Sequence, residues 1–164
     1  VRIVFLDTTP LIDSYRKNSE TYPDACKENR EAQLAWLDST LKSAKEDWVI
    51  VVGHHPIYAE TGKKENERLD MQKYLLPVLH KYNNVAIYAC GHIHNFQHIQ
   101  KKGDPIDYVV NSSSSLARPV KPIDGTVFCS PADGYSVFTI DKKQLRMSMI
   151  DKDGNIIHTI TKNK

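Results

Sequence analysis

The stretch Trp48-Val49-Ile50-Val51-Val52-Gly53-His54-His55-Pro56 decides the fold class of this 164-residue chain. It begins as an apolar, mostly β-branched run, which is typical of a strand buried on both faces, and it ends in glycine and two histidines. A second stretch repeats this arrangement, because the apolar run 85–90 is followed by Gly91-His92-Ile93-His94-Asn95. In α/β proteins such strands deliver residues to the sheet edge where ligands bind. The sequence therefore predicts an α/β fold with histidines gathered at one edge.

Helical periodicity surrounds these two strands. Leu34, Leu37 and Leu41 recur at helical spacing after Asn29, a residue that favours the N-cap, so we expect a helix from residue 29 to near 46. A second helix is expected over the apolar positions between 69 and 82, broken near Pro77 because proline lacks a backbone N–H. Residues 57–66, between the first motif and this helix, are expected to form an exposed loop over the site.

After the second motif the apolar period changes from about 3.6 residues to about 2, which predicts strands. The first residues of the chain also have the pattern of a strand. Residues 112–130, which contain prolines and a glycine, are expected to form a long loop that covers the rim. Turn signals separate the last three strands, which should form an antiparallel meander and give the C-terminal part α+β character. The expected strands are 1–7, 48–52, 85–90, 96–100, 108–111, 135–140, 145–150 and 156–160.

Composition excludes several classes of protein. The net charge of +2 is small, and basic residues are interspersed with acidic ones, so nothing indicates nucleic-acid binding. No apolar run approaches the roughly 20 residues of a membrane span. The three cysteines lack metal-type spacing and do not form a disulfide framework; Cys90 is expected to be a buried thiol. The chain has neither a signal peptide nor an initiating Met, and we expect it to be part of a longer protein.

The histidines of the two motifs carry the chemical prediction. Neutral imidazole binds zinc, iron and manganese, and two strand-ending histidine motifs in one chain predict a metal site. The alternative is that they are solvent-exposed loop histidines. His80 and His158 have no partner motif and are expected to be structural or surface residues, and His98 is expected to be structural.

Residues 48–56 and 85–98 resemble the third and fourth sequence blocks of the calcineurin-like metallophosphoesterases. The match is strongest to the purple acid phosphatase branch with its tartrate-resistant acid phosphatase-like members, whose blocks G-H-x-P and G-H-x-H-N-x-Q resemble residues 53–56 and 91–97. The helix containing residues 33–37 also resembles the family. The resemblance implies that the chain is the C-terminal half of a two-sheet sandwich flanked by helices.

The resemblance also implies a set of metal ligands. His54 and His92 would bind a divalent metal, and His94 would bind the second ion, which is ferric iron in purple acid phosphatases. The full-length parent would therefore hold two metal ions, iron paired with iron, zinc or manganese.

Substrate-facing roles follow from the same resemblance. His55 would act in catalysis or contact the substrate, and Asn95 would contact the phosphate ester. Some relatives carry a proton-donating histidine in the loop after the first motif; here Glu60 is the candidate general acid in that loop.

Three carboxylate-bearing blocks of the family are missing. The N-terminal half of the family carries D-x-G or D-x-H, G-D-x-x-Y and G-N-H-D/E blocks, and none occurs here; Gly103-Asp104 follows the second motif and has the pattern of a hairpin turn. We therefore expect residues 1–164 to be a single partial domain without the N-terminal metal-binding half. Alone it should hold at most one metal with partial occupancy, be inactive, and self-associate through faces that the other half would cover.

For the parent protein the resemblance implies a dinuclear phosphatase that hydrolyses phosphate monoesters by attack of a metal-activated hydroxide. It also implies an extracytoplasmic location, either periplasmic or secreted. Two alternatives remain open: a phosphodiesterase of the same superfamily, and a catalytically inactive truncated domain that binds at most one metal and acts as a scaffold.

Overall fold

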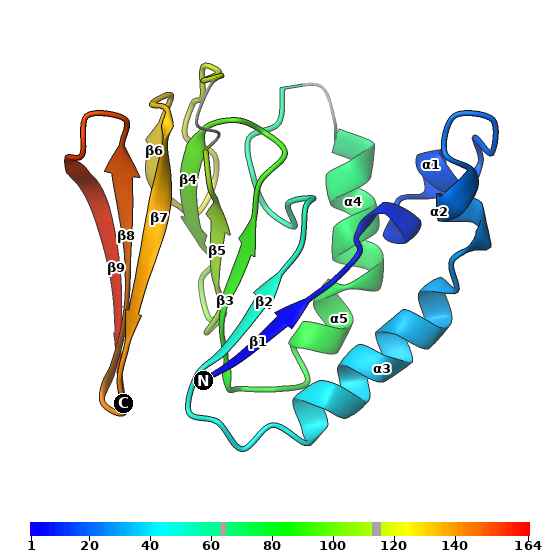
Figure 1. The fold of residues 1–164 in the computed structure, drawn as a ribbon, viewed down its shortest axis with the longest axis horizontal. Helices are drawn as coiled ribbons and strands as arrows, with labels where there is room; N and C mark the ends of the chain where they lie inside the picture. Colours follow the sequence, from blue (N-terminus) through cyan, green and yellow to red (C-terminus); the bar gives the residue numbers. More distant parts are fainter. Residues whose placement is uncertain (63–64, 113–115) are drawn as a thin grey trace.

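The computed structural model describes residues 1–62, 65–112 and 116–164, and these residues form two β-sheets with helices packed against the larger one (Figure 1). The larger sheet has six strands in the order β1-β2-β3-β5-β4-β6, and the smaller has the order β7-β8-β9. The strands are β1 (Arg2–Phe5), β2 (Val49–Val52), β3 (Val85–Cys90), β4 (Phe96–Gln100), β5 (Asp107–Val110), β6 (Thr126–Ser130), β7 (Gly134–Ile140), β8 (Gln144–Asp151) and β9 (Ile156–Asn163).

The helical elements all precede β3 in the chain. No helix in the described part of the chain is both long and apolar enough to span a bilayer. The elements are the 3-10 helix η1 (Thr9–Leu11) and the α-helices α1 (Asp13–Arg16), α2 (Pro23–Lys27), α3 (Arg30–Lys42), α4 (Glu65–Tyr74) and α5 (Leu76–Leu79).

Parallel pairing places the two histidine motifs side by side. Strands β1, β2, β3 and β5 run parallel, and Val52 at the end of β2 pairs with Ala89 near the end of β3. The Gly53 N–H donates to the Ala89 carbonyl (3.0 Å), and the Gly91 N–H donates to the His54 carbonyl (3.2 Å). The α/β prediction is confirmed, and both motifs leave the sheet at the same edge.

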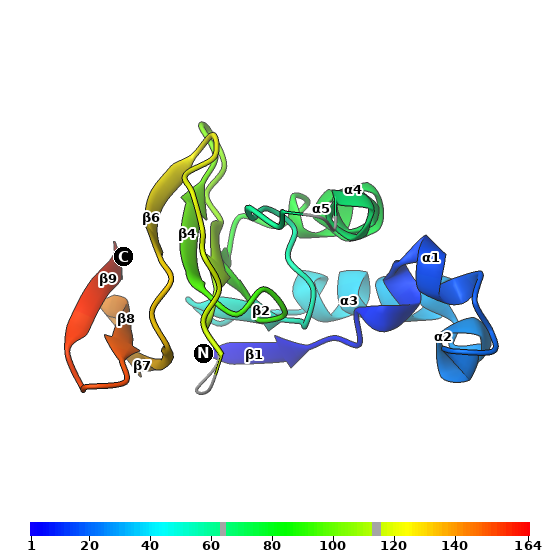
Figure 2. The ribbon, with the colours of Figure 1, turned by 90° about the horizontal axis from the view of Figure 1, so that it is seen from above.

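Strand β2 in the middle of the six-stranded sheet is buried on both faces, which explains its unbroken apolar run. Val49 and Val51 pack into a core with the helices, whereas Trp48 and Ile50 pack against the three-stranded sheet. Figure 2 shows this layering, with α3, α4 and α5 on one side of the large sheet and β7–β9 on the other. The β7–β9 meander is antiparallel throughout, as predicted.

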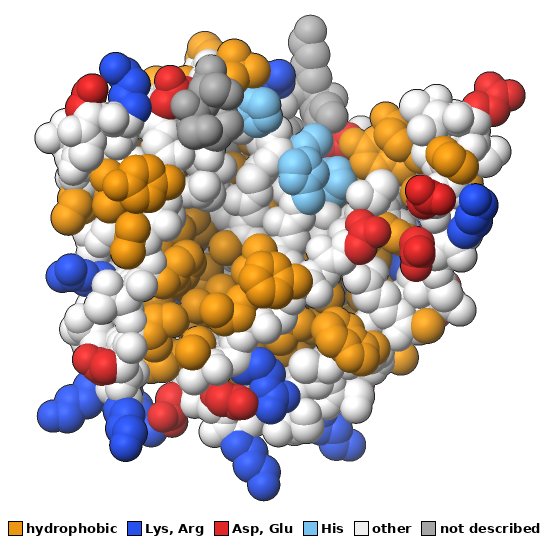
Figure 3. Space-filling model, viewed as in Figure 1, with side chains coloured by type: hydrophobic (Ala, Val, Ile, Leu, Met, Phe, Trp, Pro, Cys, Tyr) orange, Lys and Arg blue, Asp and Glu red, His pale blue; other side chains and the backbone are white. Residues whose placement is uncertain are grey.

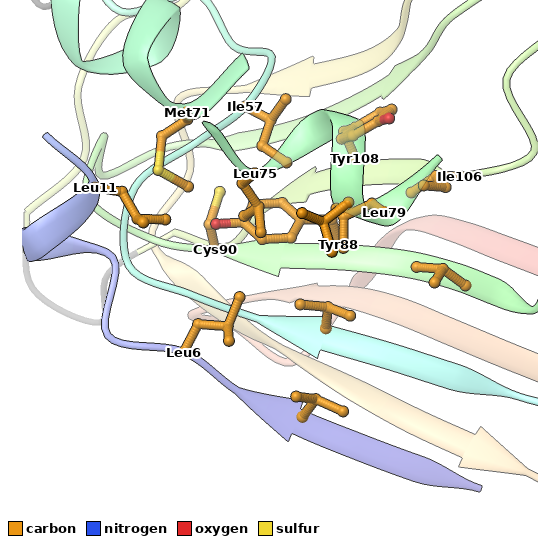
Figure 4. Close-up of a cluster of buried hydrophobic side chains, with 14 of the residues drawn as sticks. Leu6, Leu11, Ile57, Met71, Leu75, Leu79, Tyr88, Cys90, Ile106 and Tyr108 are labelled. Atoms are coloured by element: carbon orange, nitrogen blue, oxygen red, sulfur yellow. The ribbon is translucent and has the colours of Figure 1, made fainter. Parts of the chain in front are cut away.

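The core on the helical side lies directly beneath the C-terminal ends of β2 and β3, where the two histidine motifs begin. Tyr88 of β3 is completely buried there beside the side chains of Leu75 and Cys90 (Figure 4). Met71 of α4 and Leu11 of η1 extend this core towards the ends of the strands. All three cysteines are free, and burial raises the pKa of the Cys90 thiol, which confirms its prediction as a buried core residue.

The predicted helix after Asn29 is α3, but it ends earlier than expected. Asn29 is the N-cap and accepts the Ala32 N–H through its side chain (2.8 Å). The helix ends at Lys42 rather than near Glu46, because side chains bind the backbone carbonyl that a further helical turn would use. The Ser43 hydroxyl and the Arg2 guanidinium both donate to the Thr40 carbonyl, at 3.0 and 2.8 Å.

The second predicted helix is interrupted before Pro77, as expected. The segment α4 ends at Tyr74 and α5 begins at Leu76, with proline in the first turn of α5. The preceding residues 57–62 form neither helix nor strand, but they are not the exposed loop that was predicted: Ile57 and Ala59 are completely buried in the core. Residues 63–64 lie outside the described residues.

Two further expectations need correction. The predicted loop 112–130 contains strand β6, which pairs with β4 along the sheet edge; the prolines before it masked the short run of strand-forming residues 126–129. Residues 113–115 of that loop lie outside the described residues. Helices α1 and α2 were also missed, because elements of four or five residues are too short to show a periodicity.

A buried polar network joins the two sheets. The His98 Nε2–H donates to Asp107 (2.7 Å), and Lys162 of β9 binds the other oxygen of that carboxylate (2.8 Å). His98 Nδ1 lies 3.0 Å from His158 Nε2 of β9, and the His158 ring stacks on Phe128. Burial alone would raise the pKa of Asp107, but the hydrogen bonds from His98 and Lys162 outweigh it and lower that pKa.

This network confirms a structural place for His98, and the two other histidines also make structural contacts, as predicted. His158 contacts His98 across the sheet interface. His80 binds Asp104 (2.8 Å) of the turn that contains Gly103. Asp104 in addition accepts from the Tyr108 hydroxyl, so it serves this turn, as the hairpin prediction requires.

The loop after β1 is packed tightly onto the loop after β2. The Thr8 hydroxyl oxygen accepts the N–H groups of His54 (3.2 Å) and His55 (3.1 Å). A Cβ atom at Gly53 would lie 2.5 Å from the Thr8 methyl group and 2.6 Å from the Tyr88 hydroxyl, far inside contact distance. Glycine at position 53 thus allows Thr8 to reach the first histidine motif.

This close packing gives a first prediction. Gly53→Ala should lower the free energy of unfolding by about 1–3 kcal/mol, because Thr8 and Tyr88 must move to admit the methyl group. Urea denaturation measures the loss. Gly91→Ala is the matched control, since a Cβ there meets nothing within 4 Å. Equal destabilisation by the two substitutions would contradict the steric account.

The inter-sheet network gives a second prediction. Burial and the neighbouring His98 lower the pKa of His158, so the folded state favours the neutral ring. Its contribution to stability is present above the ordinary histidine pKa of about 6.5 and is lost as pH falls through the lowered folded pKa. His158→Gln should therefore flatten the fall in melting temperature on the acidic side of about pH 6.5. Thermal unfolding measures this. If the variant loses stability in acid as steeply as the wild type, His158 is not the group responsible.

Candidate metal centre

Two imidazoles from different strands face each other at the sheet edge. His54 follows β2 and His92 follows β3, and His54 Nε2 lies 3.0 Å from His92 Nδ1. Figure 3 shows histidine side chains exposed together near the upper end of the molecule. The parallel register of β2 and β3 is what places these two nitrogens at contact distance.

The backbone of the second motif is bent sharply to present its histidines. His92 and His94 both adopt positive φ angles, 71° and 61°, which are uncommon for residues other than glycine. Around His92 the Ile93 N–H donates to the Gly91 carbonyl (2.8 Å), which closes a three-residue turn. Strained backbone of this kind tends to occur at functional sites.

His55 joins the two facing histidines. Its ring is only 2% exposed, with its centroid 4.6 Å from that of His92 and 5.0 Å from that of His54. One ring nitrogen from each of these three residues lies within 4.8 Å of the others. In residues 1–62, 65–112 and 116–164 this is the one group of three or more His, Cys, Asp or Glu side chains so arranged.

Glu67 is a site residue that the sequence did not reveal. It lies on α4, is 5% exposed, and binds His92 Nε2 through one oxygen (2.7 Å) and the Tyr15 hydroxyl through the other (2.6 Å). Burial and the bond to Glu67 raise the pKa of Tyr15, so the phenol stays protonated and donates. An acidic residue in the first turn of a polar helix is commonplace, which hides this role in the sequence.

These contacts fit a divalent cation held by His54 and His92. A carboxylate on Nε2 of His92 fixes the hydrogen there and leaves the Nδ1 lone pair facing His54, which is the arrangement of metal-bound histidines with carboxylate partners. No carboxylate of the described residues belongs to the clustered group, so these residues do not offer the bridging oxygens of a two-metal centre.

His94 and Asn95 lie beside this group rather than in it. The structure does not bring His94 into the cluster; its Nδ1 is buried without a hydrogen-bond partner among the described residues. Asn95 is completely buried, and its oxygen accepts from Gln97 (2.8 Å), while its NH2 group has no partner in the described part of the chain.

A cavity of about 650 Å³ extends from these residues to the loop after β5. Its polar wall includes His92, His94, Asn95, Glu60 and two cationic residues that the sequence did not suggest, Arg118 and Lys121. The Arg118 N–H donates to the His94 carbonyl (2.8 Å), so residues of the predicted rim-covering loop do border the site.

Glu60 reaches the cavity, although it is tied into its own loop. Its carboxylate accepts the Gly62 N–H (3.1 Å), and its backbone exchanges two hydrogen bonds with the side chain of Gln97. The catalytic role predicted for Glu60 remains a prediction.

Comparisons with known sequences connect this geometry to a family. Residues 3–96 match the family model of the calcineurin-like phosphoesterases. Tartrate-resistant acid phosphatase type 5 of Oryctolagus cuniculus is 36% identical over 73% of this chain and 36% of its own length. Purple acid phosphatase 4 of Arabidopsis thaliana is 29% identical over 95% of this chain and 48% of its own length. The chain thus spans half or less of the length of these relatives.

Solved structures share the fold. A structure described as "GAP50 the anchor in the inner membrane complex of Plasmodium" matches 98% of this chain and 48% of that chain, with a TM-score of 0.78 and 25% identity. A dimetal phosphatase from Danio rerio matches 81% of this chain and 38% of that chain, with a TM-score of 0.53 and 17% identity, which speaks to the fold alone. On the family match and these relatives, the chain belongs to the calcineurin-like phosphoesterases, in their purple acid phosphatase-like branch.

Proposed function

We propose that this chain supplies the histidine side of the metal centre of a phosphatase that hydrolyses phosphate monoesters. The observation that carries the proposal is the 3.0 Å approach of His54 Nε2 to His92 Nδ1, with Glu67 fixing the far nitrogen of His92. In the whole protein His54 and His92 hold one divalent ion. His94 holds a second ion, completed by carboxylates from outside the described residues, with iron paired with iron, zinc or manganese.

The chain's own residues bind and orient the ester. When bound, such a metal pair supplies Lewis-acid assistance to an in-line displacement at phosphorus and a nucleophile derived from water. Asn95, Arg118 and Lys121 line one cavity, where the Asn95 amide and the two cationic side chains would hold phosphate oxygens. His55 donates a hydrogen bond beside the ligand pair, and Glu60 is the candidate proton donor to the leaving oxygen.

A non-catalytic anchoring role is the second candidate. GAP50, which is described as an anchor, matches nearly the whole of this chain. The absence of a carboxylate from the histidine group of the described residues also favours it, since this chain alone would hold at most one metal. A phosphodiesterase of the same family is the other enzymatic alternative, separated from the monoesterase only by substrate.

We propose in addition that the isolated chain self-associates and that the native protein is exported. Ile3 (49% exposed) and Phe5 (71% exposed) share one side of β1, a strand at the edge of the sheet. Hydrophobic side chains gather over the middle of the face seen in Figure 3. We expect such surfaces to drive self-association of the isolated chain, and light scattering over a range of concentrations tests this. We further propose an extracytoplasmic location for the native protein.

The test of function is turnover of aryl phosphates. The native protein in its full length, loaded with iron and zinc, should hydrolyse an aryl phosphate monoester faster than the corresponding diester, and His92→Ala should abolish turnover. The 164-residue chain alone should be inactive under the same conditions. Faster hydrolysis of the diester would favour the phosphodiesterase. No turnover by the metal-loaded native protein would overturn the enzymatic proposal in favour of the anchor.

Metal retention provides a prediction for the chain alone. His92→Ala should lower zinc affinity at least tenfold, because it removes a ligand, and Glu67→Gln should lower it by about 10- to 100-fold, because second-sphere partners of metal-bound histidines contribute this much. Equilibrium dialysis with zinc measures both. His80→Ala is the control, since His80 lies outside the group and binds Asp104. Equal losses in all three variants would contradict the ligand assignment.

A further inference from the structure

We propose that Thr8 and Glu67 divide the clustered histidines into two kinds: His92 turns a lone pair towards His54, and His55 is held as an N–H donor rather than as a third metal ligand. Thr8 is then a positioning residue of the site. That phosphate accepts the His55 N–H rests on the proposed function, whereas the positions of the hydrogens on the His55 and His92 rings do not.

The Thr8 hydroxyl makes three hydrogen bonds. A hydroxyl has one hydrogen to donate and two lone pairs that accept. Both lone pairs of Thr8 Oγ1 are taken by the backbone N–H groups of His54 and His55. The third contact, 2.7 Å to His55 Nδ1, is therefore the bond in which Thr8 donates.

The bond from Thr8 fixes the position of the hydrogen on the His55 ring. A neutral ring that accepts at Nδ1 carries its hydrogen on Nε2. His55 consequently carries its hydrogen on Nε2, and its lone pair at Nδ1 is used by Thr8. Proximity alone would make His55 a third ligand, but its hydrogen-bond partner assigns it to the donors.

Burial and a backbone hydrogen bond hold His55 in place. The ring is buried, and the Tyr88 hydroxyl donates to the His55 carbonyl (2.7 Å). Thr8 can lie this close because Gly53 has no side chain. The donor direction is therefore built into the packing between the loops after β1 and β2.

His92 also carries its hydrogen on Nε2. Its Nε2–H is directed into the Glu67 carboxylate, so its Nδ1 lone pair faces His54. The lone pair of His92 can bind a cation, and the N–H of His55 can donate to an anion next to it. A phosphate oxygen is such an anion.

Nitrogen NMR of the histidine rings tests this assignment. Two-bond 1H–15N correlation spectra of the 15N-histidine-labelled chain, recorded without metal at about pH 8, where an ordinary imidazole is neutral, should show His55 with a protonated Nε2 and an accepting Nδ1. Thr8→Ser, which keeps the hydroxyl, should preserve this pattern, and Thr8→Val, which removes it, should abolish the preference. The opposite tautomer in the wild type, or an unchanged pattern in Thr8→Val, would overturn the proposal.

Zinc titration of the same sample provides the second readout. Zinc should shift His54 Nε2 and His92 Nδ1 while His55 keeps its Nε2 hydrogen. In equilibrium dialysis His55→Gln should change zinc affinity less than threefold, whereas His54→Gln should lower it at least tenfold. Loss of the His55 Nε2 hydrogen on adding zinc, or equal loss of affinity in the two variants, would make His55 a ligand and refute the division.

Adding inorganic phosphate to the zinc-loaded chain tests whether phosphate accepts the His55 N–H, which is the part of the proposal that rests on the proposed function. A shift of the His55 Nε2 proton supports a phosphate acceptor. No shift removes phosphate as the acceptor but leaves the tautomer and zinc results as they are, so the two failures can be told apart.

Discussion

The parallel pairing of β2 with β3 is the constraint on which the site depends. It aligns the ends of two buried strands, so that His54 and His92 approach to 3.0 Å although 38 positions of sequence separate them. Both strands are apolar on both faces, since helices cover one face and the three-stranded sheet covers the other. Cores on two sides therefore fix the register, and the register fixes the distance between the imidazoles.

Residues from other elements then determine what each imidazole can do. Glu67 reaches His92 from α4, and Thr8 reaches His55 from the loop after β1. Neither belongs to the clustered histidine group, yet each contact assigns the hydrogen of one ring and thereby separates a lone pair from a donor. Tyr15 completes the arrangement by donating to the second oxygen of Glu67, which keeps that buried carboxylate satisfied.

The sequence revealed the parts of this arrangement that are local. Strands β3 and β4 and the N-cap Asn29 could be predicted because periodicity and capping depend on neighbouring residues. The two histidine motifs could be found because each follows a recognisable strand. Glu67 and Thr8 could not, since a glutamate on a polar helix and a threonine after a strand acquire their roles only when distant segments meet. The pairing of His158 with His98 was missed for the same reason: it requires the docking of one sheet on the other.

We infer that His54 and His92 form a metal-binding pair whose geometry is fixed by the sheet. Crystals of the chain grown with zinc test it most directly, through an anomalous difference map at the zinc edge. We expect a peak about 2.0–2.1 Å from His54 Nε2 and His92 Nδ1, with Glu67 still bound to His92 Nε2. A zinc ion bound through Nε2 of His92, or an anomalous peak elsewhere with none between these two rings, would contradict it.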